Sequence, residues 1–210
     1  MAGGKLARRR AKKVFAAFKH LDEDAPDAIV LRNGVEPHID LSFFYATAIP
    51  SGIFEGGMCV LHRDGNVDVF SSVLEEESAR RAGTGFRLRI PRRRGDEAKT
   101  LRRVLDGRAK RTIGINGPEL TYRDFRVLRK YLPKAKFVDA ARAILRARMI
   151  KDDSEVDAIH EACRIASKTA NQIPDLLRTG VSEAEVAAEI NYRNQKYGGQ
   201  GPSFDTISGD

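Results

Sequence analysis

The chain has 210 residues, of which 41% are hydrophobic and 31% charged, and 37 Lys and Arg against 29 Asp and Glu give a formal net charge of +8. Such a length buries either one large core or one complete domain with part of another. The sequence contains no apolar run of membrane-spanning length, no secretory leader pattern and only two cysteines, which excludes membrane-spanning and disulfide-rich secreted classes and leads us to expect a cytoplasmic protein.

The charge is distributed unevenly. Residues 1–147 carry 30 Lys and Arg against 18 acids, whereas residues 148–210 carry 7 against 11. We therefore predict two domains, 1–147 and 148–210. Residues 80–111 are the most basic, with 13 Lys and Arg against three acids. A nucleic-acid surface is one interpretation, but Phe86 is the only aromatic residue among these arginines, so we favour a plain charged surface.

The chain opens with an amphipathic pattern over residues 5–21. Its apolar positions recur on one helical face, and Lys and Arg occupy the remainder. A nucleic-acid or membrane-binding arm is possible, because clustered cations favour phosphates. Phe15 and Phe18 need a core, however, so we predict a helix packed on a sheet.

Strand-like and helix-like segments then alternate to residue 147. The turn Asp64-Gly65-Asn66 indicates a hairpin, and Asn33 to His38 reads as a loop. The alternation predicts an α/β domain with a mixed sheet. The expected strands are 27–32, 41–49, 58–62, 67–70, 86–90, 112–116 and 137–138, and the expected helices are 73–82, 96–105 with its end at Asp106-Gly107, 118–132, and one capped by Asp139.

Residues 148–210 read as two helices and a short strand. Ser154 and Ser182 each begin a helix-start box, and Pro174 predicts a break between the helices. Apolar residues recur at helical spacing on the first helix, namely Val156, Ile159, Cys163, Ala166, Ala170 and Ile173. Residues 203–207 read as the strand. Cys59 and Cys163 occupy apolar positions and are expected to be reduced core thiols.

Three ordered stretches resemble one family. They are "RMIKDDSEVDAIHEACRIASKTA", "TGVSEAEVAAEI" and "GPSFDTI". They are similar to the opening of the pita-bread domain of the proline-specific metallopeptidases: Xaa-Pro dipeptidase (prolidase), aminopeptidase P and creatinase. "FFYAT" also resembles a stretch of that family's amino-terminal domain, with Ala48 where glycine is usual.

The resemblance implies a fold and an activity. The fold is a creatinase-type amino-terminal α/β domain followed by the first helices and strand of a pita-bread domain. The activity is hydrolysis of X-Pro bonds by water activated on two divalent ions, Mn, Co or Zn, in a homodimer. Phe204 and Ile207 fall at family positions that line the substrate pocket, although core packing is the alternative and is preferred for Ile207. His38 is a weaker candidate at a neighbouring subunit's site.

The resemblance also implies that the chain stops before the family's metal ligands. We predict no catalytic or metal-binding residue in it, because the histidines at 20, 38, 62 and 160 show no paired ligand spacing. The 210-residue chain would then be inactive, and it would either be aggregation-prone around Ile159, Ile190 and Phe204 or depend on a partner. Dipeptidase and aminopeptidase P both remain open. The competing hypothesis is a non-catalytic pita-bread protein whose basic amino-terminal domain engages nucleic acid or an acidic partner.

Overall fold

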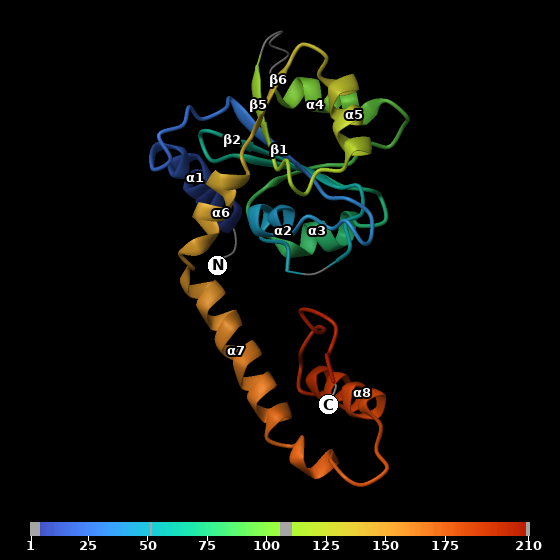
Figure 1. Cartoon of the computed structure of the whole chain (residues 1–210). Coiled ribbons are helices and arrows are strands. Elements are labelled where there is room, and N and C mark those ends of the chain that lie inside the picture. The colour runs from blue at the N-terminus through green and yellow to red at the C-terminus, as the bar shows by residue number, and fades with distance from the viewer. Residues whose placement is uncertain (1–4, 51, 106–110, 209–210) are drawn as a thin grey trace. The chain divides into compact units, whose positions relative to one another are not determined.

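The structure, a computed structural model, describes residues 5–50, 52–105 and 111–208. The helix end predicted at Asp106-Gly107 lies outside these residues. The chain divides into two compact units, Met1–Ile150 and Lys151–Asp210, and each is described by itself (Figure 1). None of the helices in the described ranges combines the length and apolar character that a membrane span requires.

The first unit is built on a six-stranded mixed sheet. Its strands run in the order β4-β3-β2-β1-β5-β6. Strand β2 pairs antiparallel with both β1 and β3, while the β1–β5, β3–β4 and β5–β6 pairs are parallel. The strands are β1 (Ala28–Arg32), β2 (Met58–His62), β3 (Val67–Phe70), β4 (Arg87–Arg89), β5 (Thr112–Ile115) and β6 (Lys136–Asp139).

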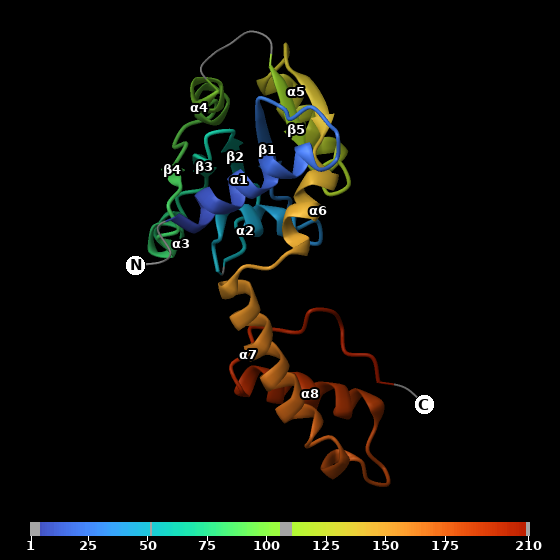
Figure 2. The same ribbon diagram turned by 90° about the vertical axis from the view of Figure 1, so that its left-hand side faces the viewer.

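Helices cover both faces of this sheet (Figure 2). One face packs with α1 (Leu6–Lys19), α2 (Leu41–Thr47), α3 (Glu76–Ala82) and α6 (Ala141–Met149), and the other with α4 (Asp96–Val104) and α5 (Tyr122–Tyr131). Because successive strand residues point to opposite faces, Ile29 and Leu31 enter the first core and Ala28 and Val30 the second. The predicted α/β class with a mixed sheet is confirmed.

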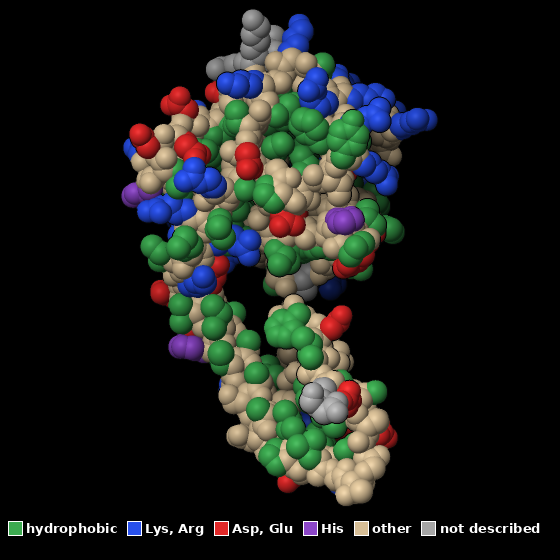
Figure 3. All heavy atoms as spheres, viewed as in Figure 1, with side chains coloured by type: hydrophobic (Ala, Val, Ile, Leu, Met, Phe, Trp, Pro, Cys, Tyr) green, Lys and Arg blue, Asp and Glu red, His purple; other side chains and the backbone are tan. Residues whose placement is uncertain are grey.

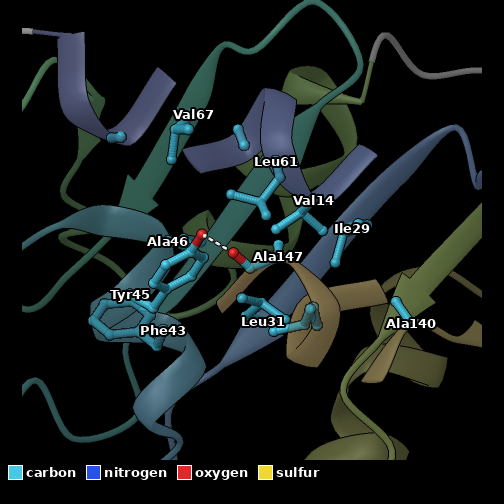
Figure 4. Close-up of a cluster of buried hydrophobic side chains, with 14 of the residues drawn as sticks. Val14, Ile29, Leu31, Phe43, Tyr45, Ala46, Leu61, Val67, Ala140 and Ala147 are labelled. Carbon is cyan, nitrogen blue, oxygen red and sulfur yellow. Dashed lines mark hydrogen bonds between the residues drawn. The ribbon is translucent and has the colours of Figure 1, made fainter. Parts of the chain in front are cut away.

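Helix α1 packs as the sequence predicts. Ala7, Ala11, Val14, Ala17 and Phe18 are buried on one side of the helix. In the close-up of this core, Val14 lies among strand residues Ile29 and Leu61, and the Tyr45 hydroxyl donates a hydrogen bond of 3.2 Å to the Ala147 carbonyl (Figure 4). The bond ties α2 to α6.

The segment predicted as a strand at 41–49 is instead helix α2. Its N-cap, Asp40, accepts a hydrogen bond of 2.8 Å from the Ser42 amide, and the helix ends at Ala48 with φ 55° and ψ 26°. Aromatic residues favour strands on average, but that preference is weaker than tertiary packing. Here the helix buries Phe43, Tyr45 and Ala46, so tertiary packing determines the helical conformation of this segment.

Between β2 and β3 the predicted hairpin is confirmed. Leu61 pairs with Val67, and the His62 amide donates to the Asn66 carbonyl at 2.9 Å. Gly65 sits in the turn with φ 88°, a left-handed conformation that glycine adopts without strain. The next segments also match: 86–90 contains β4 and 96–105 contains α4.

The second unit consists of α7 (Asp153–Ala170), a 3₁₀ turn η2 (Pro174–Leu176), α8 (Glu183–Lys196) and an irregular segment to residue 208. The capping box predicted at Ser182 is confirmed. For α7 the cap is Asp152 instead of Ser154, because Asp152 and Glu155 satisfy each other's backbone amides. The helix also ends four residues before Pro174, so the predicted break begins earlier.

The buried side of α7 differs from the predicted stripe. Ile165 and Thr169 are buried, whereas Cys163 is exposed, so its assignment as a core thiol is wrong; Cys59 is buried as predicted. Val156 and Ile159 remain 38% and 46% exposed. The predicted uncovered surface at Ile159 is therefore confirmed. Hydrophobic side chains lie open along this unit, while Lys and Arg gather on the first (Figure 3).

Candidate functional site

The two residues predicted to line a substrate pocket lie in the irregular segment after α8. Phe204 is 74% exposed and Ile207 is 89% exposed. Neither side chain packs in a core of the described residues, and both the pocket assignment and the core-packing alternative for Ile207 stay predictions. An aromatic ring and a branched aliphatic side chain are thus both left open to solvent in this segment.

Residues 203–207 do not form the predicted strand. A strand requires a neighbour that accepts and donates its backbone hydrogen bonds, and no described segment of the second unit supplies one. The segment is held instead by a side chain: the Thr206 hydroxyl lies 2.7 Å from Asn191 Oδ1 on α8. This bond anchors the backbone between Phe204 and Ile207.

Helices α7 and α8 give this segment its support. Ile165 and Val186 are the buried apolar pair where the helices meet. Beyond the end of α7, Gln172 Oε1 accepts hydrogen bonds from Arg193 and, at 2.7 Å, from the Tyr197 hydroxyl. The Lys168 ammonium lies 3.9 Å from the centre of the Tyr197 ring, a cation–π contact. Polar and aromatic contacts therefore fix the end of α8, where the Phe204 segment starts.

The described part of the chain contains no set of residues that could bind a metal ion. No group of three or more His, Cys, Asp or Glu side chains there is arranged to hold an ion. His160 is exposed on α7, and His62 Nε2 is 2.9 Å from Asp68 Oδ2. A two-metal site needs several convergent carboxylates or imidazoles. The described residues do not fit such a site.

In the first unit, His38 lies on a loop that is held firmly at both ends. Asn33 is buried, and its Nδ2 donates to the carbonyls of Ile53 and Phe54 at 2.9 Å each, while its Oδ1 accepts from the Asp40 amide at 3.0 Å. His38 itself is exposed. The loop follows the carboxyl end of β1 and presents His38 to solvent.

Buried polar side chains join this loop to the next parallel strand. Asn116, directly after β5, donates from Nδ2 to Asp40 Oδ1 at 3.0 Å and to Ser42 Oγ at 3.2 Å. Burial raises the pKa of Asp40 above its ordinary value, although hydrogen bonds from Ser42 and Asn116 oppose the rise. The carboxyl ends of β1 and β5, where α/β sheets commonly bind ligands, are thus closed by internal hydrogen bonds.

An ion-pair cluster lies beside that network and was not foreseen from the sequence. The Arg32 guanidinium contacts Glu97 at 3.0 Å and Asp124 at 2.9 Å, and the Tyr131 hydroxyl donates to Glu97 at 2.8 Å. Burial alone would lower the pKa of Arg32, but the two carboxylates outweigh it and raise that pKa. The sequence signal was available, since Arg32 ends an otherwise apolar strand. The cluster joins α4 and α5 to β1 and is structural.

Comparison with known protein families gives two matches in sequence order. Residues 17–150 match the Creatinase/Prolidase N-terminal domain, and residues 157–209 match metallopeptidase family M24. The first match alone covers well over half of the chain.

Known proteins and solved structures agree with these matches. The Xaa-Pro dipeptidase of Pyrococcus horikoshii is 25% identical over 196 residues, which are 93% of this chain and 51% of that protein. The structure of the Xaa-Pro dipeptidase from Bacillus anthracis has a TM-score of 0.76 at 23% identity, over 95% of this chain and 52% of that one. The amino-terminal domain of a FACT complex subunit from Cicer arietinum shares the fold, with a TM-score of 0.61 at 14% identity over 93% of this chain and 52% of that one. The chain spans about half the length of these relatives.

Proposed function

This chain belongs to the family of the Creatinase/Prolidase N-terminal domain, and from that premise we propose that it is the amino-terminal portion of a metal-dependent Xaa-Pro peptidase. The observation that carries the proposal is the pair of consecutive family matches, 17–150 and 157–209, with a dipeptidase relative aligned across both. In this proposal residues 1–147 are the amino-terminal domain, and residues 148–210 begin the catalytic domain.

The proposed reaction is hydrolysis of an X-Pro peptide bond by a water molecule activated on two divalent ions, Mn, Co or Zn. Dipeptidase and aminopeptidase P specificities both fit. In this proposal the metal ligands lie outside residues 1–210. The 210-residue chain alone is then expected to hydrolyse nothing.

Phe204 and Ile207 are proposed to line the pocket for the substrate's apolar side. Their support is their exposure in a segment held by Thr206 and Asn191. His38 is proposed to face solvent in the free protein, on the loop that Asn33 holds in place.

We further propose a homodimer in the cytoplasm. The first unit exposes Val35, Ile53, Val73 and Leu74, the last at 94%. These residues come from neighbouring loops, because Asn33 bonds to the Ile53 carbonyl and the Phe54 amide bonds to Glu75. Clustered exposed apolar residues are typical of a protein–protein interface. Both cysteines are free thiols, as a reducing compartment favours.

The decisive experiment expresses the complete reading frame that contains residues 1–210, beside the 210-residue chain. Each protein is treated with a chelator, then given Mn²⁺, Co²⁺ or Zn²⁺ singly, and assayed on an X-Pro dipeptide with an X-Ala dipeptide as control. Metal-dependent cleavage of the X-Pro peptide by the complete protein alone is expected. A complete protein that cleaves neither peptide with any ion contradicts the proposal and favours the non-catalytic binding function.

The pocket assignment has its own test in the complete protein. Phe204→Ala is expected to lower kcat/KM for the X-Pro dipeptide about tenfold, the effect of losing roughly 1.4 kcal/mol of contact. Tyr192→Ala is the matched control, since it removes another exposed aromatic ring of the second unit, 56% exposed, from α8. Equal effects of the two variants would remove Phe204 from the pocket.

A further inference from the structure

A polar cleft lies in the first unit, on the sheet face that α4 and α5 cover. Its volume is about 390 Å³, and its walls come from the β2–β3 hairpin, from β4 and from the last turn of α4. The side chains that matter are Asp68 on β3, Arg87 and Arg89 on β4, and Arg103 on α4. All of them belong to the first unit.

The cleft is organised around a buried carboxylate. The Asp68 side chain is 0% exposed. Its oxygens accept hydrogen bonds from Nε and Nη2 of Arg87 at 3.1 and 2.5 Å and from Nε of Arg89 at 2.9 Å, and Arg89 Nη2 forms an ion pair with Asp68 Oδ1 at 2.8 Å. His62 Nε2 contacts the same carboxylate at 2.9 Å. This arrangement follows from register, because Asp68 pairs with Arg87 across the parallel strands β3 and β4.

Asp68 has apolar neighbours on its own sheet face. Its cross-strand neighbour Val60 and its near neighbour Phe70 point to the same side and lie in the second core. A buried ion pair rarely stabilises a fold more than apolar residues of the same size would, because desolvation offsets the attraction. The clear effect of Asp68 is geometric: it holds two guanidinium groups side by side.

Each of these guanidinium groups keeps donors for a further partner. Arginine has five N–H donors, and Asp68 uses only those on Nε and Nη2. The side chains of Arg87 and Arg89 are 50% and 34% exposed, so their remaining N–H groups face the cleft and solvent. Arg103 also lines the cleft and is exposed, and its side chain makes no hydrogen bond or ion pair with any other residue in the described ranges.

The charge of the cleft indicates that its ligand is an anion. Three arginines face two carboxylates, Asp64 and Asp68. The Asp64 carboxylate is engaged with its own turn, where it accepts from the Asn66 amide at 2.8 Å. Positive charge with planar, paired donors recognises both carboxylate and phosphate oxygens, and a cluster of three arginines favours the more highly charged phosphate. We propose that this cleft binds a small phosphate-class oxyanion through Arg87, Arg89 and Arg103.

Isothermal titration of the 210-residue chain with inorganic phosphate, against sodium chloride of equal ionic strength, tests the proposal. Saturable binding is expected, with acetate weaker. Arg103→Gln is the informative variant, because Arg103 is exposed and its loss leaves the Asp68 contacts intact. It should weaken phosphate about tenfold, as the loss of one charge-assisted contact predicts. The control Arg123→Gln removes an exposed arginine of α5 and should leave the affinity unchanged within about twofold.

Several results would overturn the assignment. One is the absence of saturation by about 10 mM phosphate, an affinity too weak for a site. Another is equal weakening by Arg103→Gln and Arg123→Gln, which would indicate diffuse attraction to a basic surface. Acetate binding as tightly as phosphate would reject the phosphate class. Circular dichroism of each variant confirms that the fold is retained.

Discussion

Replacing Asp68 by Asn removes one negative charge from the buried ion cluster while preserving the side-chain shape. The carboxylate accepts from His62, Arg87 and Arg89 through two oxygens, whereas an amide accepts through one and turns N–H groups towards the cations. Breaking a fully buried pair costs about 3–5 kcal/mol, but Arg87 and Arg89 are partly exposed and regain water. We therefore expect a loss of about 2–3 kcal/mol in the free energy of unfolding.

Urea denaturation at several pH values measures this loss and identifies its origin. Burial alone would raise the pKa of Asp68, but hydrogen bonds from His62, Arg87 and Arg89 outweigh it and hold that pKa below its ordinary value. A carboxyl group with a lowered folded-state pKa stabilises the fold above its unfolded pKa of about 3.9. That contribution disappears as the pH falls through the folded value. The difference between wild type and variant should thus be constant from about pH 5 to 7 and shrink below about pH 4.

The matched control is Asp24→Asn, an exposed carboxylate of the same unit with no partner among the described residues. It should change the free energy of unfolding by less than about 0.5 kcal/mol at any of these pH values. Two results would refute the reasoning: a loss for Asp68→Asn as small as that of the control, or a loss as large at pH 3 as at pH 7.

Three further predictions rest on local features. Ala48→Gly should raise the free energy of unfolding by about 0.5–1 kcal/mol in urea titrations, because Ala48 has φ 55° and glycine adopts that conformation without strain; a loss would contradict this. Exposed Cys163 should react with a thiol reagent in the folded chain, whereas Cys59, whose pKa burial raises, should react only after denaturation; equal rates would be contrary. Phe204→Ala should leave the melting temperature of the 210-residue chain within about 2 °C, because the ring is 74% exposed, and a larger drop would indicate packing.

Local signals predicted most of the first unit. The hairpin follows from Asp64-Gly65-Asn66, which sets the chain reversal without help from distant residues. Helix α1 follows from an apolar stripe wide enough to seek a core. The prediction of a strand at 41–49 was wrong because the aromatic residues of this segment favour strands. Only the cap at Asp40 and the left-handed conformation of Ala48 indicate a helix. The resemblance of this stretch to the family's amino-terminal domain, which usually has glycine in place of Ala48, was the available hint.

The polar clusters were harder to foresee, because their members are distant in sequence. Asp68 meets Arg87 only through the parallel pairing of β3 with β4, and no local pattern predicts which strands become neighbours. The alternation of Arg87 and Arg89 around Leu88 was visible, but it reads equally well as a solvated strand face. A carboxylate between Val67 and Val69, in a strand buried on both sides, was the signal that it needed a cationic partner.

In the second unit, the apolar residues at helical spacing outnumber those that the unit buries. Two apolar positions, Ile165 and Val186, account for its buried hydrophobic residues among those described, while Val156 and Ile159 keep helical spacing on an open face. A solvated helix gains nothing from a regular apolar stripe, since exposed apolar surface favours association. The same reasoning applies to Phe204, whose segment lacks a neighbouring strand. Both observations support the proposal that the unit begins a catalytic domain, in which further strands and helices would cover this face.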